Sequence, residues 1–188
     1  MALPQFPGPA KLRSGQVQES KTRDVNVVRT VQLKSPINLV NALPITKPAE
    51  QTVLEGREAI RGVLRGEDSR MMMVVGPCSI HDEKAALEYA ERLLALSKDV
   101  SDRLLLVMRV YFEKPRTTVG WKGLIYDPHL NDTLEIATGL QRARRLMRDI
   151  AEMGMCAGTE FLDPIIPQYL ADLVSWATIG ARTTESQT

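Results

Sequence analysis

The chain has 188 residues, of which 44% are hydrophobic and 25% are charged, and its net charge is +1. This composition is typical of a globular protein with one core, and the near-neutral charge argues against a general binder of nucleic acids or anionic membranes. Its two cysteines, Cys78 and Cys156, are too few for a disulfide framework, and no apolar run reaches the ~18 residues that span a bilayer. The N-terminus lacks an apolar signal segment, so we expect a cytoplasmic protein.

The first 50 residues form the least patterned part of the chain. They contain several prolines, and only 25–33, with its β-branched residues, is a candidate strand. We interpret residues 1–50 as an N-terminal extension, an arm for oligomer contacts or regulation, with a disordered tail as the alternative. Residues 51–188 are interpreted as one domain.

Helix and strand signals alternate beyond residue 50. Thr52 and Glu55 form a capping-box pattern that predicts a helix start, and Gly66 predicts its end. Asp82 and Asp132 are the expected N-caps of two later helices. Strands are expected over 71–76, 103–112, 156–162 and 177–182, and the intervening helices over 83–97, 132–154 and 167–176.

The βαβαβαβ order predicts an α/β fold with a parallel sheet and right-handed crossovers. None of the strands alternates polar with apolar residues, which predicts that both faces of the sheet are covered. In such folds ligands bind at the carboxyl ends of the strands.

Cations dominate these strand ends. Four basic residues lie between positions 109 and 122 against the single acid Glu113, and Arg182 follows the last strand. Arginine and lysine suit carboxylate and phosphate groups, so a small anionic, phosphorylated substrate is predicted. A solvated basic loop is the alternative.

Cys78 follows a Gly-Pro turn at the end of the first strand. Three roles are open to it on local grounds: a nucleophile, a metal ligand, or a small buried apolar residue. No Cys-x-x-Cys or His-x-x-x-His pair accompanies it, so any metal would need ligands from distant strands.

Three long motifs strongly resemble the microbial type I 3-deoxy-D-arabino-heptulosonate 7-phosphate synthases: GPCSIHD, RVYFEKPRTTVGWKGLIYDP and FLDP…PQYLADLVSWATIGARTTESQ. The resemblance runs from about residue 50 to the end of the sequence. It implies a (β/α)₈ barrel with its site at the carboxyl-terminal face. It also implies a transferase reaction, the first step of the shikimate pathway to aromatic amino acids, in which phosphoenolpyruvate condenses with erythrose 4-phosphate.

The resemblance further implies a divalent metal ion, such as Mn, Fe or Co, with Cys78 as one ligand. Arg109 resembles the arginine that holds phosphoenolpyruvate, and Lys114 the lysine between the two substrates; these two are the predicted catalytic residues. The remaining predicted substrate-binding residues are Pro115, Arg116 and Thr117, for erythrose 4-phosphate, and Glu160, Ala181 and Arg182, for phosphoenolpyruvate.

A barrel needs eight strands and ~250 residues, whereas four strands are predicted here. We therefore expect this chain to be the front half of such an enzyme, with the other metal ligands beyond residue 188, and we expect the isolated chain to be inactive and prone to aggregate. A catalytically inactive, truncated half-barrel is the alternative. A related synthase that uses arabinose 5-phosphate is disfavoured by the segment KPRTTVGWKG.

The family habit also implies a homo-oligomer and feedback inhibition by an aromatic amino acid. The resemblance places the effector site near residues 161–168. Pro164 and the final residues SQT lean toward tyrosine as the effector.

Overall fold

The structure is a computed structural model in which residues 22, 30–116 and 119–180 are described. Of the compact unit Met1–Gln32, only residues 22 and 30–32 are described, and they form neither helix nor strand. The second unit starts at Leu33. It contains α1 (Pro36–Ala42), α2 (Lys47–Arg65), β1 (Met71–Val75), α3 (Glu83–Asp99), β2 (Leu104–Arg109), α4 (Ile136–Glu152), β3 (Ala157–Phe161), α5 (Pro167–Leu170), the 3-10 turn η1 (Ala171–Leu173) and β4 (Trp176–Ile179).

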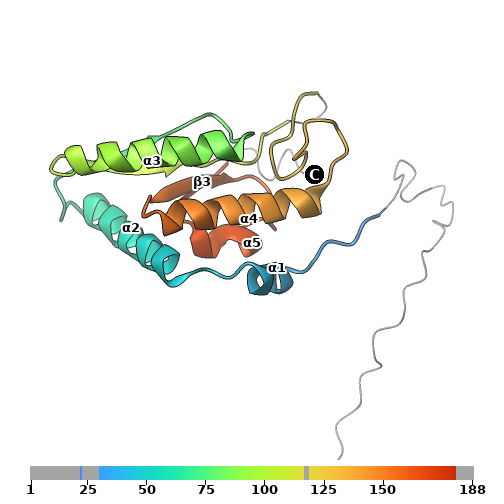
Figure 1. The fold of residues 1–188 in the computed structure, drawn as a ribbon, viewed down its shortest axis with the longest axis horizontal. Coiled ribbons are helices and arrows are strands. Elements are labelled where there is room, and N and C mark those ends of the chain that lie inside the picture. Colours follow the sequence, from blue (N-terminus) through green and yellow to red (C-terminus); the bar gives the residue numbers. More distant parts are fainter. Residues whose placement is uncertain (1–21, 23–29, 117–118, 181–188) are drawn as a thin grey trace, which may run out of the picture. The chain divides into compact units, whose positions relative to one another are not determined.

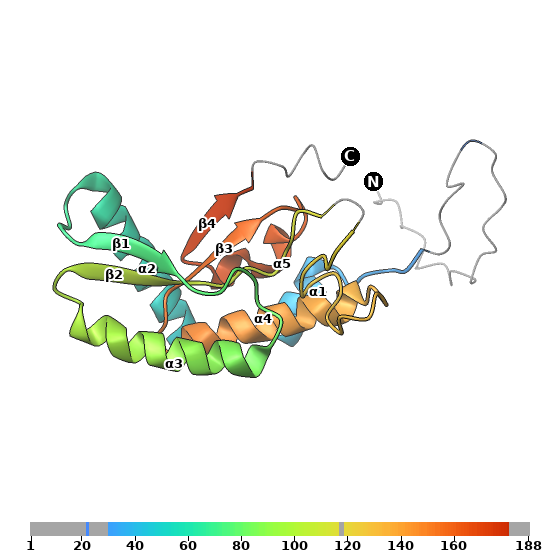
Figure 2. The same cartoon turned by 90° about the horizontal axis from the view of Figure 1, so that it is seen from above.

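The four strands form one parallel sheet in the order β1-β2-β3-β4, which confirms the α/β fold and the parallel topology. Figures 1 and 2 show α3 and α4 lying along one face of this sheet. Because each strand is followed by a helical crossover, all four carboxyl ends lie at the same edge of the sheet. That edge holds the predicted site residues.

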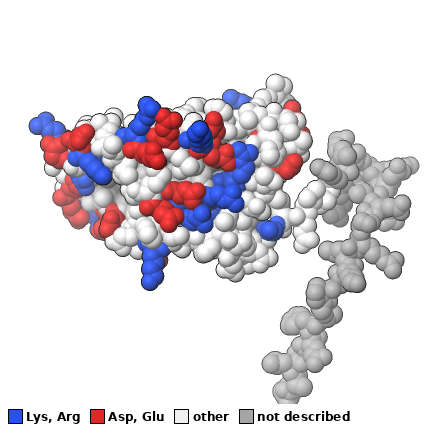
Figure 3. All heavy atoms as spheres, in the orientation of Figure 1, with Lys and Arg blue, Asp and Glu red and all other residues white. Residues whose placement is uncertain are grey.

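The hydrophobic core lies between the sheet and the helices. Met108 of β2 and Val110, which directly follows β2, are fully buried, as are Met147 and Ile150 of α4. On the outer surface of the helical layer, Figure 3 shows Lys and Arg interspersed with Asp and Glu. α3 and α4 therefore each place one apolar stripe on the sheet and a polar surface toward solvent.

The prediction that both faces of the sheet are covered was wrong for the outer strands. Met71 of β1 is 66% exposed and Ile179 of β4 is 83% exposed. α3 and α4 lie along one face, and β1 and β4 are the two edges of the sheet. Only β2 and β3 are flanked by strands on both sides, and they hold most of the buried strand residues.

Two predicted helix starts were wrong, for local reasons. α2 begins at Lys47 with Thr46 as N-cap, since Pro48 fits the first turn, and the Thr52 hydroxyl donates within the helix to the Pro48 carbonyl (3.1 Å). α2 therefore crosses the predicted boundary at residue 50 between the N-terminal extension and the following domain. The role of the extension as an arm for oligomer contacts or regulation stays a prediction. The predicted end at Gly66, in the left-handed conformation with φ 73°, is confirmed.

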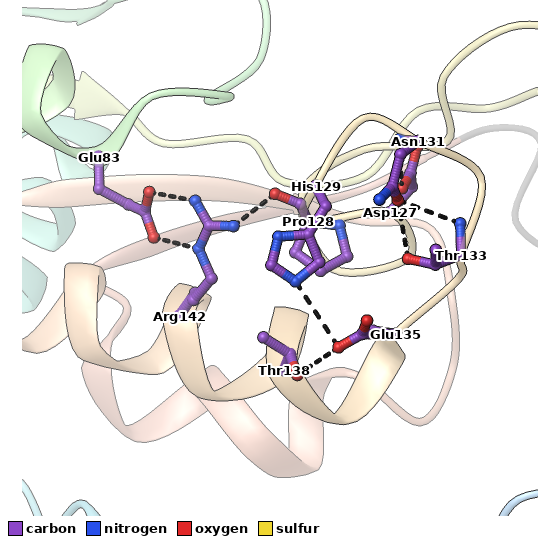
Figure 4. Close-up of polar contacts among 9 residues, drawn as sticks. All are labelled: Glu83, Asp127, Pro128, His129, Asn131, Thr133, Glu135, Thr138 and Arg142. Atoms are coloured by element: carbon purple, nitrogen blue, oxygen red, sulfur yellow. Dashed lines mark hydrogen bonds and ion pairs between the residues drawn. The ribbon is translucent and has the colours of Figure 1, made fainter.

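The start of α4 shifts from the predicted Asp132 to Ile136. Figure 4 shows the reason: the loop before α4 is held by its own side chains. Asp127 accepts from the Asn131 amide (3.2 Å), and the Asn131 side chain accepts from the Thr133 amide (3.2 Å). Such bonds compete with helical ones and delay the helix. By contrast, Asp82 does cap α3, accepting from Ala85 N at 3.0 Å.

Within the described residues, no helix combines the length and the apolar character needed to cross a membrane. The candidate strand over 25–33 lies mostly outside the described residues, and its described part, residues 30–33, is irregular.

Candidate functional site

The Gly-Pro-Cys turn brings β1 close to the end of β2. A side-chain carbon on Gly76 would lie 2.7 Å from the Arg109 carbonyl oxygen, so only glycine allows this approach. After Pro77 the chain reaches Cys78, which is exposed at the edge of the sheet. Ser79 and Ile80 then both bond to the Tyr111 carbonyl, at 3.1 and 2.8 Å, which fixes the turn against the segment after β2.

The central contact of the site joins Lys114 to Cys78. The Lys114 ammonium donates to the Cys78 sulfur at 2.8 Å. This hydrogen bond lowers the pKa of the Cys78 thiol, and the charge of Lys114 and the more distant charges of Arg109 and Arg116 lower it further. The Cys78 thiol therefore ionises to a thiolate more readily than an ordinary cysteine does. The interpretation of Cys78 as a buried apolar residue is wrong, because the residue is exposed.

Arg109 lies beside this pair. Its Nη2 donates to the Cys78 carbonyl at 3.3 Å, and its guanidinium carbon lies 3.7 Å from the centre of the Tyr111 ring. The Arg109 Nε is buried and has no hydrogen-bond partner among the described residues. A buried donor without a partner is uncommon and suits an anion that this structure does not contain.

The segment after Lys114 turns back tightly on itself. Lys114 N donates to the Lys122 carbonyl (3.1 Å), and Arg116 N donates to the Lys114 carbonyl across Pro115 (2.8 Å). Gly120 lies under the Arg116 side chain, since a side-chain carbon there would be 3.3 Å from Arg116 Nε. These bonds hold three of the predicted residues together; Thr117 lies outside the described ones.

The structure therefore brings Cys78, Arg109 and Lys114 into direct contact. Glu160 is on β3 opposite Thr178 of β4, at the same edge of the sheet, and is partly buried. Within the described part of the chain it makes no hydrogen bond or ion pair to those three residues. The predicted residues Ala181 and Arg182 lie outside the described residues.

Glu113 is a candidate functional residue that the sequence analysis did not select. Its side chain is buried, and its two carboxylate oxygens accept from the Leu162 amide (3.2 Å) and the Asp163 amide (3.1 Å). Burial raises the pKa of Glu113 to about 7, and the neighbouring charge of Asp163 adds to this increase. The only sequence signal is its place directly after an apolar segment and before a catalytic candidate.

The loop that follows the cationic segment is anchored on α3 and α4. Trp121 Nε1 donates to the Asp127 carbonyl at 2.8 Å. Arg142 of α4 bonds both to Glu83 of α3 and to the carbonyl of Pro128, as Figure 4 shows. The mutual hydrogen bond lowers the pKa of Glu83, which keeps the pair ionised. The loop is thus tied to the helical layer at Pro128.

The donor chemistry at Cys78 fits a divalent transition metal, because a thiolate stabilised by nearby cations is a strong ligand. Cys78 is a single donor, however. Among the described residues no group of three His, Cys, Asp or Glu side chains lies close enough together to hold a metal ion.

Comparisons with known proteins agree on one family. Residues 42–188 match the model of the DAHP synthetase I family. The chain is 56% identical over 164 residues to the Phe-sensitive phospho-2-dehydro-3-deoxyheptonate aldolase of Escherichia coli, covering 87% of this chain and 47% of that protein. It is 51% identical over 172 residues to the Tyr-sensitive enzyme of the same organism, covering 92% and 48%.

A solved structure gives the same result. The phospho-2-dehydro-3-deoxyheptonate aldolase of Francisella tularensis superposes with a TM-score of 0.81 at 48% identity, over 86% of this chain and 48% of that one. The chain thus spans about half the length of the curated relatives it matches.

Proposed function

Because this chain belongs to the DAHP synthetase I family, we propose that the protein carrying it condenses phosphoenolpyruvate with erythrose 4-phosphate and water, giving 3-deoxy-D-arabino-heptulosonate 7-phosphate and phosphate. The observation that supports this most directly is the contact of Cys78, Lys114 and Arg109 at the strand ends. Two cations beside a thiolate-competent sulfur suit two phosphorylated substrates and a metal ion.

Arg109 is proposed to bind phosphoenolpyruvate. Its buried Nε, which has no partner within the described residues, is available to a carboxylate or phosphate oxygen. Stacking on Tyr111 fixes the plane of the guanidinium, so little side-chain freedom is lost on binding. Glu160, Ala181 and Arg182 are proposed to complete this half of the site.

Lys114 is proposed to lie between the two substrates. Its ammonium donates one hydrogen bond to the Cys78 sulfur, at 2.8 Å, and this leaves its other protons for substrate oxygens. Pro115, Arg116 and Thr117 are proposed to contact erythrose 4-phosphate, for which the backbone turn between Lys114 and Arg116 provides a rigid support.

In the proposed reaction a carbon–carbon bond forms between C3 of phosphoenolpyruvate and the aldehyde carbon of erythrose 4-phosphate. The aldehyde oxygen gains a proton, water adds to C2, and the bond between C2 and the phosphate oxygen breaks. Negative charge moves onto the aldehyde oxygen and then onto the departing phosphate. Lys114 and Arg109 stabilise these charges where they develop.

Cys78 is proposed to ligate a divalent metal ion, which would act as a Lewis acid toward the substrate aldehyde. The sulfur is held for this role by the turn after Gly76 and by the hydrogen bond from Lys114. The further ligands are not among the described residues.

The finer parts of the fold and regulation are also proposals. We propose that the four parallel strands belong to a (β/α)₈ barrel and that the protein is a homo-oligomer. We propose an aromatic amino acid as feedback effector, since the named relatives include Phe-sensitive and Tyr-sensitive enzymes. The preference for tyrosine stays a prediction that rests on Pro164 and on residues outside the described ones. The cytoplasmic location also stays a prediction.

The reaction is tested with the purified protein that carries this chain, by measuring phosphate release and product from phosphoenolpyruvate and erythrose 4-phosphate. Lys114→Met should lower kcat/KM by about 100-fold or more, because it removes a cation at the developing charge. Lys98→Met, at the exposed far end of α3, is the matched control and should leave it unchanged. A preference for arabinose 5-phosphate, or no product from either sugar, would contradict the proposal.

A further inference from the structure

Glu113 differs from the other acids near the site because its carboxylate is directed into the protein. Its exposed fraction is 4%. Two backbone amides from the turn after β3 donate to it, Leu162 N at 3.2 Å and Asp163 N at 3.1 Å. The carboxylate thus connects the segment after β2 with the segment after β3, 49 and 50 residues further along the chain.

The ionisable groups that face this carboxylate are Tyr126 and Asp163. The Tyr126 hydroxyl lies 3.5 Å from one Glu113 oxygen and donates to Asp163 at 3.0 Å. Burial raises the pKa of Tyr126, so its hydroxyl stays protonated at neutral pH. Within the described residues, no Lys, Arg or His forms an ion pair with Glu113, so in the ionised state its charge is balanced by the two backbone amides and by the longer contact from the Tyr126 hydroxyl.

Glu113 is joined to the candidate site through the next residue. Lys114, whose ammonium bonds the Cys78 sulfur, follows Glu113 directly. The backbone has little room to move here, because a side-chain carbon on Gly123 would lie 2.9 Å from the Glu113 Cα. A change at the Glu113 carboxylate therefore reaches the position of Lys114 through a rigid backbone.

We propose that Glu113 is a positioning residue: its carboxylate clamps the Lys114 segment to the turn at Leu162 and Asp163. The effect on catalysis rests on the proposed function, whereas the clamp itself does not. Burial raises the pKa of Glu113, so ionisation favours an opened state in which the carboxylate reaches water, and the clamp weakens as the pH rises through about 7.

The direct test is hydrogen exchange of the Leu162 and Asp163 amides, compared between the wild-type protein and Glu113→Gln. Glutamine keeps one acceptor oxygen but presents an amide donor to the other backbone amide. After correction for the intrinsic pH dependence of exchange, we expect about 10-fold faster exchange of at least one of the two amides below about pH 7, as loss of one such bond predicts. Unchanged exchange would overturn the clamp.

The pH dependence supplies a second test that does not need Glu113 to be replaced. Protection of the two amides in the wild-type protein should fall as the pH rises through about 7, and in Glu113→Gln it should not. Asp163→Asn removes a like charge and should move the midpoint to lower pH, while Tyr126→Phe removes a donor and should move it to higher pH. Identical midpoints in all three proteins would contradict the assignment to Glu113.

The catalytic consequence is measured separately. In Glu113→Gln we expect the KM for erythrose 4-phosphate to rise about 10-fold below about pH 7 with kcat changed much less, because the variant misplaces Lys114 rather than removing it. An unchanged KM would overturn the positioning role. Intact protection in a wild-type protein that makes no product would instead contradict the proposed function and leave the clamp in place.

Discussion

Two arginines, Arg144 in the helical layer and Arg109 at the strand ends, show opposite ways of holding a guanidinium group. Arg144 is fully buried, and it donates to the Leu43 carbonyl (2.8 Å), the Tyr169 carbonyl (2.7 Å) and both Asp172 oxygens (2.7 and 2.8 Å). Among the described residues the Arg109 side chain makes one hydrogen bond, at 3.3 Å, and its Nε has no partner.

The difference separates a structural arginine from a binding one. Every nitrogen of the Arg144 guanidinium already has an acceptor, so this residue joins α4 to the segment before α2 and to η1. Arg109 retains an unused donor at the edge where the cations gather. Burial alone does not distinguish the two; the number of satisfied donors does.

The largest expected effect comes from replacing the structural arginine, Arg144. Arg144→Met should lower the free energy of unfolding by about 3–5 kcal/mol, because it leaves Asp172 and two carbonyls without their donor. Urea denaturation measures the change. Asp172→Asn is the matched control and should cost less, since Asp172 is partly exposed and asparagine still accepts a hydrogen bond. A loss below about 1 kcal/mol would show that the network contributes little to stability.

Arg109→Lys tests the other side. We expect the affinity for phosphoenolpyruvate to fall about 30- to 100-fold, since lysine cannot donate from the position of Nε, while the free energy of unfolding changes by less than about 1 kcal/mol. Calorimetric titration gives the affinity. Arg92→Lys, on the exposed surface of α3, should change neither quantity. Equal affinity in the Arg109 variant would contradict its binding role.

Glu113 is intermediate between these two arginines, since its carboxylate is buried but no ion pair within the described residues balances its charge. Its raised pKa means that the folded state binds the proton more tightly than the unfolded state does. The stabilising contribution is therefore complete below about pH 4.5 and is lost as the pH rises through about 7. Relative to Glu113→Gln, the wild-type protein should lose about 1–2 kcal/mol of unfolding free energy between pH 5 and pH 8. Parallel stability curves would exclude this titration.

The smallest expected effect compares the two cysteines. Lys114→Met should slow alkylation of Cys78 at pH 7.5 by roughly 3- to 10-fold, because the thiol loses the hydrogen bond that lowers its pKa. Cys156 is the internal control: burial raises the pKa of its thiol, so it should react slowly in both proteins. Mass spectrometry of the two labelled peptides follows both rates. Equal Cys78 rates would show that Lys114 does not activate the sulfur.

Local signals in the sequence determined most of the secondary structure. The apolar run at Met71, the Asp82 cap and Gly66 each act within a few residues, so the start of β1, the start of α3 and the end of α2 are found where they were predicted. The starts at Lys47 and Ile136 were missed because Pro48 fits into a first turn and because side chains of the preceding loop compete with the helix.

Local patterns along the chain predict the alternation of strands and helices, and with it the edge at which Cys78, Arg109 and Lys114 gather, because parallel strands joined by helices end on the same side. Which of these groups touch depends on how the strands and helices pack. Lys114 meets Cys78 from 36 residues away, and Glu113 meets the amides of Leu162 and Asp163 from 49 and 50 residues away. Such contacts depend on the register of the strands and on the burial that packing imposes, and these are properties of the assembled sheet rather than of any one segment.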